Sequence, residues 1–478
     1  MSAAPKRGAR KVCTNRRKHT DKPARKSAGR PKGTYALISL GCPKNLVDSE
    51  RMAGLLRPNG YRMVPEPKGA DFVVINTCAF LRQARDESLG VIREMVALKQ
   101  RGLLGGIIVA GCLAEREKAE LLTDCPGIDQ LVGVFGRDEV ATAADRLIGG
   151  VTEQRTIFRP APRVPLPDLD RLRITPPHLA FLKIAEGCNR LCSFCLIPSM
   201  RGPYASKPIE QIVAEAEQLA GDGARELVVI AQDTSFYGLD IYGRPRLAEL
   251  LARLAEIDGL NWIRLMYLYP MHVTEELIDV VGRSDRVLPY LDVPLQHIDD
   301  EILRRMRRNV TRAEVERLLD RLYGRIDRLV LRTTFIVGFP GETDRQFEQL
   351  LDFVEQRRFE RLGVFAYSDE PGTPSAELDG KLPDDVKQSR RDRLLMAQQA
   401  IAFDWNDSQV GRKLDVLIDR DIPGEKNAYV GRSYADAPEV DGAVYVTGAN
   451  LRPGRICPCE IVATRGYDLI AVCEAAQP

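Results

Sequence analysis

Long hydrophobic runs are absent from this chain of 478 residues. No stretch approaches the roughly 18 consecutive apolar residues that a membrane helix needs, which excludes a protein that crosses a bilayer with helices. The apolar core of a secretory signal peptide is also missing near the start, so we expect no export. Internal repeats of solenoid period are lacking too, which excludes a repeat architecture.

The eleven cysteines are the most informative part of the composition. They are spread along a chain far longer than the small secreted domains that depend on disulfides. We therefore expect reduced thiols in the cytoplasm, free to bind metal. The 44% hydrophobic and 28% charged residues are ordinary for a globular protein, and the length suggests about three domains.

Residues 1–33 form a strongly basic tail. They carry twelve Lys or Arg and one Asp, a net charge of +11, which leaves −9 for the rest of a chain whose total is +2. The tail has too few apolar groups to fold alone, and we expect it to be disordered. Three interpretations stay open: a solvated extension, an organellar transit peptide, and an arm that contacts nucleic acid such as ribosomal RNA.

Residues 34–150 alternate between apolar runs and helical patterns. The succession strand, helix, strand, helix, strand is typical of an α/β domain with a parallel sheet, of the Rossmann or flavodoxin-like kind. The strands are expected at 34–40, 71–77 and 106–111, and the helices at 46–56 and 85–99.

Three further segments are expected after this domain. Residues 151–177 are rich in proline and predict a linker. Residues 178–408 contain six strand–helix units, which predict an open, partial (β/α)6 barrel. Residues 409–478 hold short strands separated by glycine turns, which predict a small antiparallel β-barrel.

The sharpest chemical signal is the run Cys188, Cys192 and Cys195, spaced Cys-x3-Cys-x2-Cys. Three thiolates so close together can wrap one iron–sulfur cluster and leave one iron open for chemistry. The alternatives are one face of a buried helix and a structural zinc site. Gly187 and Pro198 bracket the run as a loop, and no fourth zinc ligand lies nearby. A cluster is therefore the expected occupant.

Cys42, Cys78 and Cys112 form a second, dispersed set. Taken singly, each is interpreted as a small buried hydrophobic residue. Each also lies at the end of a predicted strand of the first domain. Because parallel strands end at the same edge of a sheet, where α/β proteins place ligands, the three thiols are expected to converge on a second site.

The cysteine run after the first strand of a partial barrel resembles the radical S-adenosylmethionine (SAM) superfamily. The resemblance implies a [4Fe–4S] cluster on Cys188, Cys192 and Cys195, whose open iron binds SAM and whose electron splits it to a 5′-deoxyadenosyl radical. It also implies SAM contacts near the adenine and at two strand ends. The residues concerned are Phe194, Gln232, Asp233, Gly338 and Glu342. Strand-end capping is the alternative for Gln232, Asp233 and Glu342.

The order of the folded domains resembles the methylthiotransferases over nearly all of residues 34–478. The resemblance implies an auxiliary [4Fe–4S] cluster on Cys42, Cys78 and Cys112, and identifies the last barrel as a TRAM domain. It further implies a transferase that uses one SAM as methyl donor and another as radical source. An electron donor of the flavodoxin or ferredoxin type and a sulfur donor are the implied partners.

Two segments resemble the branch of this family that modifies an aspartate of ribosomal protein S-twelve. Pro43-Lys44-Asn45 follows the first cysteine, where the branch acting on transfer RNA typically has Gln. Residues 424–442 resemble the TRAM segment of the aspartate branch. Residues 409–478 carry eight cations and ten anions, and an acidic module suits a basic ribosomal protein better than RNA phosphates.

We therefore predict methylthiolation of the β-carbon of that aspartate, in the free protein or within the small ribosomal subunit. This carbon is not acidic enough for a general base near neutral pH, so a radical is chemically reasonable and no acid–base residue is nominated. Two rival functions stay open. One is a transfer-RNA adenosine methylthiotransferase, and the other is a non-catalytic iron–sulfur protein that binds the ribosome.

The remaining cysteines and histidines give weaker signals. Core packing is favoured over a metal pair for the cysteines of the terminal barrel, and the other two cysteines stand alone. Each histidine outside the tail is either a ligand or base, or a packed, hydrogen-bonded side chain. The cysteines are Cys13, Cys125, Cys457, Cys459 and Cys473, and the histidines are His178, His272 and His297.

Overall fold

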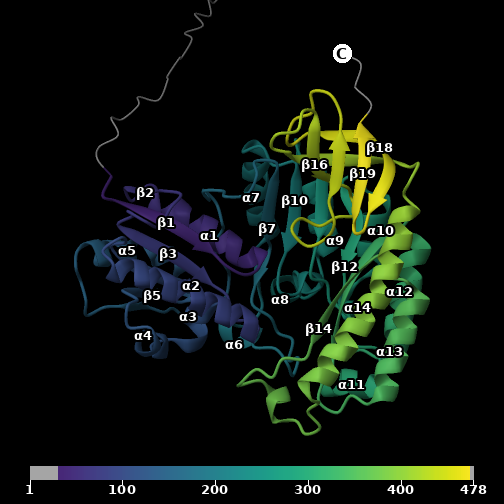
Figure 1. Cartoon of the computed structure of the whole chain (residues 1–478), viewed down its shortest axis with the longest axis horizontal. Helices are drawn as coiled ribbons and strands as arrows, with labels where there is room; N and C mark the ends of the chain where they lie inside the picture. Colours follow the sequence, from purple (N-terminus) through teal and green to yellow (C-terminus); the bar gives the residue numbers. More distant parts are fainter. Residues whose placement is uncertain (1–30, 474–478) are drawn as a thin grey trace, which may run out of the picture.

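The N-terminal part of the chain folds into a parallel sheet with helices on both faces (Figure 1). The computed structural model describes residues 31–473. The elements are β1 (Gly33–Ser39), α1 (Pro43–Leu56), β2 (Tyr61–Met63), β3 (Phe72–Thr77), α2 (Arg82–Gln100), β4 (Ile107–Gly111), α3 (Cys112–Glu117), α4 (Glu120–Asp124), β5 (Gln130–Val132), η1 (Val134–Glu139), α5 (Val140–Ile148) and β6 (Thr156–Ile157). Helices α1 and α5 pack on one face, and α2 and α3 on the other.

The sheet order, β2-β1-β3-β4-β5-β6, is that of a doubly wound fold. All neighbouring strands are parallel, which confirms the predicted α/β class. The chain leaves β1 toward β2 on one side and continues from β3 toward β6 on the other. Ligands of such sheets bind at the carboxyl edge where the direction of winding reverses, and here that point lies between β1 and β3.

The second domain is a six-stranded open barrel of the predicted kind. Its sheet order is β14-β13-β12-β11-β10-β7, with every pair parallel. Its elements are β7 (Leu179–Lys183), β8 (Ala185–Glu186), α6 (Ile197–Arg201), β9 (Ala205–Ser206), α7 (Ile209–Gly221), β10 (Glu226–Ile230), η2 (Thr234–Phe236), α8 (Leu239–Tyr242), α9 (Leu247–Ala255), β11 (Trp262–Leu265), η3 (Pro270–His272), α10 (Glu275–Arg283), β12 (Val287–Asp292), α11 (Asp300–Arg305), α12 (Arg312–Arg325), β13 (Val330–Val337), α13 (Asp344–Arg357), β14 (Arg361–Ala366), η4 (Pro374–Glu377) and α14 (Asp384–Asp407).

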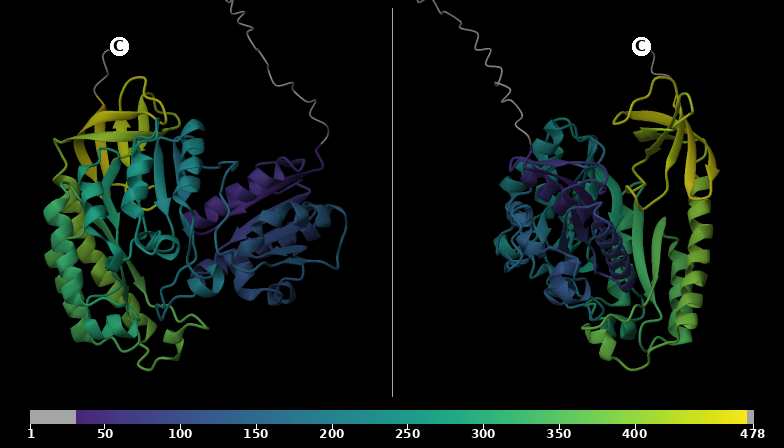
Figure 2. Two further views of the ribbon diagram at one scale, coloured as in Figure 1. Left: turned by 180° about the vertical axis from the view of Figure 1, so that it is seen from behind. Right: turned by 60° about the vertical axis from the view of Figure 1, so that its left-hand side comes forward.

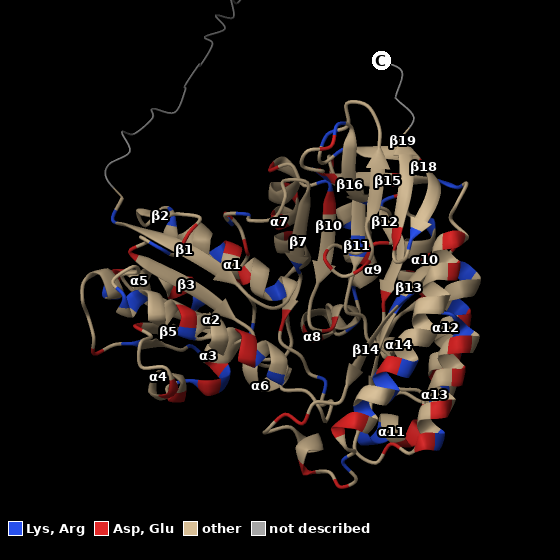
Figure 3. Cartoon of the chain, viewed as in Figure 1, with Lys and Arg blue, Asp and Glu red and all other residues tan. Residues whose placement is uncertain are grey.

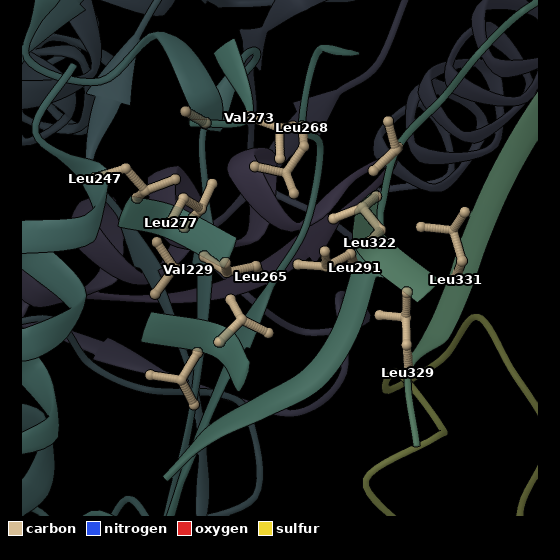
Figure 4. Packing of buried hydrophobic residues seen from close by; sticks show 14 of the residues in the cluster. Val229, Leu247, Leu265, Leu268, Val273, Leu277, Leu291, Leu322, Leu329 and Leu331 are labelled. Atoms are coloured by element: carbon tan, nitrogen blue, oxygen red, sulfur yellow. The ribbon is translucent and has the colours of Figure 1, made fainter. Parts of the chain in front are cut away.

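The main core of the barrel lies between the sheet and its outer helices (Figure 4). Successive strand residues point to opposite faces, so Val229, Leu265 and Leu291 meet helix residues such as Leu277 and Leu322. The intervening residues line the concave face. That face is also apolar, but it includes several buried charged groups that Figure 4 does not show.

The C-terminal domain is a closed five-stranded barrel with the order β15-β16-β17-β19-β18. Its strands are β15 (Lys413–Asp421), β16 (Ala428–Arg432), β17 (Val444–Thr447), β18 (Ile456–Arg465) and β19 (Asp468–Cys473). Four of the neighbouring pairs are antiparallel, as expected. The pair β17–β19 is parallel, because closure brings together two strands that are not consecutive in the chain.

The segment 433–441 of the terminal barrel packs into the concave face of the larger one. Ala435 and Ala437 join the cluster that lines this face. The guanidinium of Arg264, which is fully buried, donates to the backbone oxygens of Ser433 and Tyr434 and to Glu226. The terminal barrel is thus docked by charged groups that point inward from the strands.

This docking overturns one premise of the charge argument. The acids of residues 409–478 do not all face outward, because Asp419 pairs with Arg432, Asp436 pairs with Arg361 and Asp441 accepts a hydrogen bond from Tyr290. With those three acids and Arg432 set aside, seven residues of each sign are left. The surplus of acid is therefore used inside the molecule, whereas the outer helices α12, α13 and α14 carry both signs (Figure 3).

Residues 151–177 contain β6, the edge strand of the first sheet, and then run between the first two domains (Figure 2). Glu50 of α1 accepts backbone hydrogen bonds from Ile174 and Thr175, and the backbone of Asp168 donates to Glu215 of α7. The segment is therefore part of the interface between the two domains and not a free linker.

None of the helices in the described part of the chain is long and apolar enough to span a bilayer.

Candidate functional site

Cys42, Cys78 and Cys112 lie at the carboxyl ends of neighbouring strands. Cys42 directly precedes α1, Cys78 follows β3 and Cys112 begins α3. A Cβ added to Gly41 would stand only 2.5 Å from the Cβ and 2.9 Å from the Sγ of Cys78. Gly41 also has a φ of 87°, which glycine adopts most easily. The three thiols gather at one sheet edge as predicted, while their role as cluster ligands stays a prediction.

Asn45 of α1 ties this edge together. Its side-chain amide donates to the backbone oxygens of Leu40 and Thr77, at 3.0 and 2.8 Å. Its Oδ1 accepts hydrogen bonds from the Cys112 thiol, at 3.6 Å, and from the guanidinium of Arg201. One buried side chain therefore spans the ends of β1 and β3 and reaches the third cysteine.

Cys188, Cys192 and Cys195 lie in a loop after β7 and β8, not on a helix. The backbone N–H of Arg190 donates to the Sγ of Cys188, and that of Ile197 donates to the Sγ of Cys195, both at 3.4 Å. The helix-face alternative is therefore wrong. Amide groups aimed at sulfur suit thiolates that bind an anionic cluster.

An arginine faces each cysteine group. Arg308 donates to the Sγ of Cys192 at 3.7 Å, and Arg201 lies beside the first group through Asn45. Burial raises the pKa of Cys195 and of Cys112 to about 12, and the charges of Arg308 and Arg201 oppose that rise. Both arginines are buried, and sequence reasoning missed them because nothing local marks them.

Arg190 links the cysteine loop to the predicted SAM-binding strand end. Its Nε donates to Asp233 at 2.7 Å. Its guanidinium and that of Arg308 lie over the ring of Tyr269, at 3.9 and 4.0 Å from the centroid. The other oxygen of Asp233 accepts from Ser235 and from the backbone of Phe236, so Asp233 also caps η2, as the alternative interpretation expects.

The other predicted SAM neighbours fall into two groups. Gln232 donates to Glu186, but its Oε1 is buried without a hydrogen-bond partner, and Phe194 is half-buried and packs edge-on against Phe339. Glu342 instead accepts from Arg390 and from the backbone of Gly338. This arrangement is the strand-end capping expected as the alternative for Glu342. The SAM contacts of all five residues stay predictions.

Several buried polar atoms near the second group have no hydrogen-bond partner within the described part of the chain. They include Gln232 Oε1, Arg190 Nη2, Arg308 Nε and Tyr204 Oη. Unpaired buried polar atoms are costly, so native proteins rarely keep them without a function. Together with the thiols and the amides that point at them, these atoms fit an iron–sulfur cluster and a polar cofactor such as SAM.

A site for a single metal ion is a separate question. Among residues 31–473, no three His, Cys, Asp or Glu are grouped to hold one metal ion.

A network of buried ion pairs joins the two cysteine-bearing domains. Asp48 of α1 accepts from Arg137, Lys183 and Arg201, and Glu186 accepts from the same three cations. Asp168, Lys207 and Glu215 extend the network. These residues provide four positive and four negative charges, so the network is neutral. It fixes one cysteine group relative to the other.

Two strained residues mark the carboxyl edge of the barrel. Tyr267 and Gln296 have φ values of 63° and 73°, after β11 and β12. Such backbone strain in residues other than glycine collects at functional sites. These two of the ten residues with such a backbone in the described chain lie at the same edge as the cysteine loop.

The remaining cysteines and histidines are packed. Cys457, Cys459 and Cys473 belong to the core of the terminal barrel, and Cys125 to that of the first domain. His178 pairs with Asp419, and His297 is buried and accepts from the backbone of Asp299. His272 packs edge-on against Phe236, and burial lowers its pKa. Cys13 and residues 1–30 of the tail lie outside the described residues.

Comparison with known proteins gives matches for all three domains. Residues 34–133 match the uncharacterized protein family UPF0004, residues 182–354 match the radical SAM superfamily, and residues 410–473 match the TRAM domain. Among solved structures, the radical SAM methyltransferase TsrM from Kitasatospora setae, bound to cobalamin and a [4Fe–4S] cluster, aligns with a TM-score of 0.52. It is 16% identical and covers 72% of this chain and 73% of its own. This likeness shows the fold alone.

Curated relatives match along most of the chain. The protein of Pelotomaculum thermopropionicum is 44% identical over 436 residues, covering 91% of this chain and 97% of the relative. That of Symbiobacterium thermophilum is 44% identical over 459 residues, covering 95% and 93%. Both are named ribosomal protein uS12 methylthiotransferase RimO.

Proposed function

The chain belongs to the RimO family of radical SAM methylthiotransferases, and on this basis we propose that it adds a methylthio group to the β-carbon of an aspartate in ribosomal protein uS12. It is a transferase whose cofactors are SAM and two [4Fe–4S] clusters. The observation that carries the proposal is the pairing of two three-cysteine groups across one interface, with a buried arginine at each.

The assignment of ligands follows the two groups. Cys188, Cys192 and Cys195 would hold the SAM-binding cluster, and Cys42, Cys78 and Cys112 the auxiliary one. Bound there, the clusters supply a site for SAM, the electron that splits it, and a place to hold the sulfur that is transferred.

The chain's own residues position these parts and exclude water. Arg308 and Arg201 place positive charge beside the sulfurs, in a buried setting where charge interactions are strong. Asn45 fixes the edge on which the auxiliary cysteines lie. Gln232 and Arg190 offer buried polar atoms to SAM. No side chain needs to remove the β-hydrogen as a proton, because that carbon is not acidic.

The proposal includes partners outside the chain. An electron donor of the flavodoxin or ferredoxin type would reduce the clusters, and a sulfur donor would reload the auxiliary site. The basic tail would contact ribosomal RNA while the enzyme acts on uS12. The enzyme would work in the cytoplasm, where its substrate is made.

Mass spectrometry of uS12 from cells with and without this gene tests the proposal. We expect one aspartate to gain the mass of a methylthio group in place of hydrogen, only when the gene is present. Cys192→Ala should abolish both the modification and deoxyadenosine formation, while Cys125→Ala, in the core of the first domain, should abolish neither. An unmodified uS12 together with a lost hypermodified adenosine in transfer RNA would favour the rival enzyme. Modification that survives Cys192→Ala would favour a non-catalytic role.

A further inference from the structure

Three lysines of the described chain are buried, and only two of them have acidic partners. Lys183 donates to Asp48 and Glu186, and Lys207 donates to Asp168 and Glu215. A buried ammonium is costly unless it is paired in this way.

Lys44 is the exception. Its Nζ donates to the backbone oxygen of Ala231, at 3.3 Å, and lies 3.2 Å from the centroid of the Tyr267 ring. In residues 31–473 no carboxylate is found in an ion pair with it at 4.0 Å or less, although its exposed fraction is 8%. The buried ammonium therefore has no carboxylate of the described chain at ion-pair distance, although the charges of Cys42, Asp292 and Glu186 also act on it.

Lys44 lies beside the first cysteine group and reaches into the second domain. It follows Cys42 by two residues, and its ammonium reaches the carboxyl end of β10, directly before Gln232. The ring beneath it belongs to Tyr267, one of the two strained residues at this edge. An anion bound to Lys44 would therefore stand at the boundary between the two cysteine-bearing domains.

The sulfurs themselves already have cationic neighbours. Arg201 faces the first cysteine group and Arg308 the second. Each group thus has an arginine beside it, and Lys44 is a further cation near the first group. The missing anion is best supplied by a molecule that enters the site.

We propose that Lys44 binds the side-chain carboxylate of the target aspartate, an inference that rests on the proposed function. That carboxylate is bonded to the β-carbon from which hydrogen is removed, so fixing the carboxylate also fixes the reacting carbon. An adenosine base has no carboxylate and would leave Lys44 unpaired. Lys44 therefore selects an acidic side chain over a nucleobase, and it belongs to the same Pro43-Lys44-Asn45 segment that carries the resemblance to the aspartate branch.

Binding of purified uS12 to the reconstituted enzyme tests the inference. The probes are uS12 and a variant whose target aspartate is asparagine, and the enzymes are wild type, Lys44→Met and the control Lys68→Met. Lys68 is exposed in the connection between β2 and β3. We expect wild type and Lys68→Met to bind the aspartate form about 30-fold or more tightly than the asparagine form, as for a buried charge pair. Lys44→Met should lose this preference and keep its iron content.

The other carboxylate that enters the site is that of SAM, and equilibrium binding of labelled SAM separates the two sources. Lys44→Met that keeps the aspartate preference but loses SAM affinity would overturn the inference. So would a loss of iron, since Lys44 would then be the counter-ion of a cluster. A wild-type enzyme that never modifies uS12 would instead overturn the proposed function, and this inference with it.

Discussion

At the residue scale, two buried arginines place positive charge beside the cysteines and oppose the rise in thiol pKa that burial causes. Arg201 comes from the short helix α6 and reaches across a domain boundary to Asn45, while Arg308 follows α11 and reaches back to Cys192. Both contacts join residues far apart in the chain. The cysteine spacings could be predicted from sequence because the motif is local, whereas these partners could not, because only the folded chain brings them together.

Gly41 offers a test of the auxiliary site at this scale. In Gly41→Ala the new Cβ would collide with Cys78 and hold a left-handed backbone, at a cost of about 2–5 kcal/mol. We expect the iron content to fall from about eight toward about four per chain, while SAM cleavage at the other group persists.

Iron analysis and deoxyadenosine formation measure these two outcomes. Gly90→Ala is the matched control, since Gly90 lies within α2 with open space around its Cα, and alanine there should stabilise the helix by about 1 kcal/mol. A Gly41→Ala enzyme with full iron would show that Cys78 is not a ligand of the auxiliary cluster.

At the element scale, the long strands and helices were the predictable part. The three strands that end near Cys42, Cys78 and Cys112 have five residues or more. Their apolar runs are visible in the sequence and predicted these strands. The strands β2, β5 and β6 have three residues or fewer and leave no pattern. The sequence did not predict where residues 433–441 dock, and inward-pointing arginines of the barrel hold them against its concave face.

Glu226 of β10 governs this docking and gives it a pH dependence. Burial alone would raise its pKa, but the charges of Arg432 and Arg264 outweigh burial and lower it. A lowered pKa in the folded state means that the carboxylate stabilises the fold above its unfolded value of about 4.3. This contribution is lost as the pH falls through the folded-state pKa.

Glu226→Gln should therefore lower the free energy of unfolding by about 3–5 kcal/mol at neutral pH. As the pH falls from about 4.3 through the lower folded-state pKa, the difference from wild type should shrink, because Glu226 is protonated first in the unfolded chain and then in the folded one. Denaturant unfolding from pH 7 to pH 3 measures this. Glu94→Gln, an exposed position on α2, should show neither effect, and a constant difference at every pH would refute the linkage.

At the scale of the whole molecule, the neutral network of buried charges makes the first two domains one unit. Asp48 is its centre, since three cations of different elements converge on it. Removing a single acceptor leaves buried positive charge without compensation, which costs far more than a surface ion pair.

Asp48→Asn should lower the free energy of unfolding by about 3–5 kcal/mol and speed proteolysis within residues 151–177, because that segment would lose its packing between the domains. Denaturant unfolding and limited proteolysis followed by mass spectrometry report the two changes. Asp327→Asn is the control, with a side chain that is 96% exposed. Unchanged proteolysis in Asp48→Asn would mean that other contacts hold the domains together.

The same network has a consequence for biosynthesis. During translation Asp48 and the cysteines Cys42, Cys78 and Cys112 emerge first, and Lys183 and Arg201 leave the ribosome only after the whole first domain has been made. Until then the nascent domain carries an acid without two of its partners and an Asn45 without its arginine. If these cysteines hold a cluster, as we propose, we expect it to be loaded after synthesis has passed Arg201, because only then can Arg201 pair with Asn45 and Asp48.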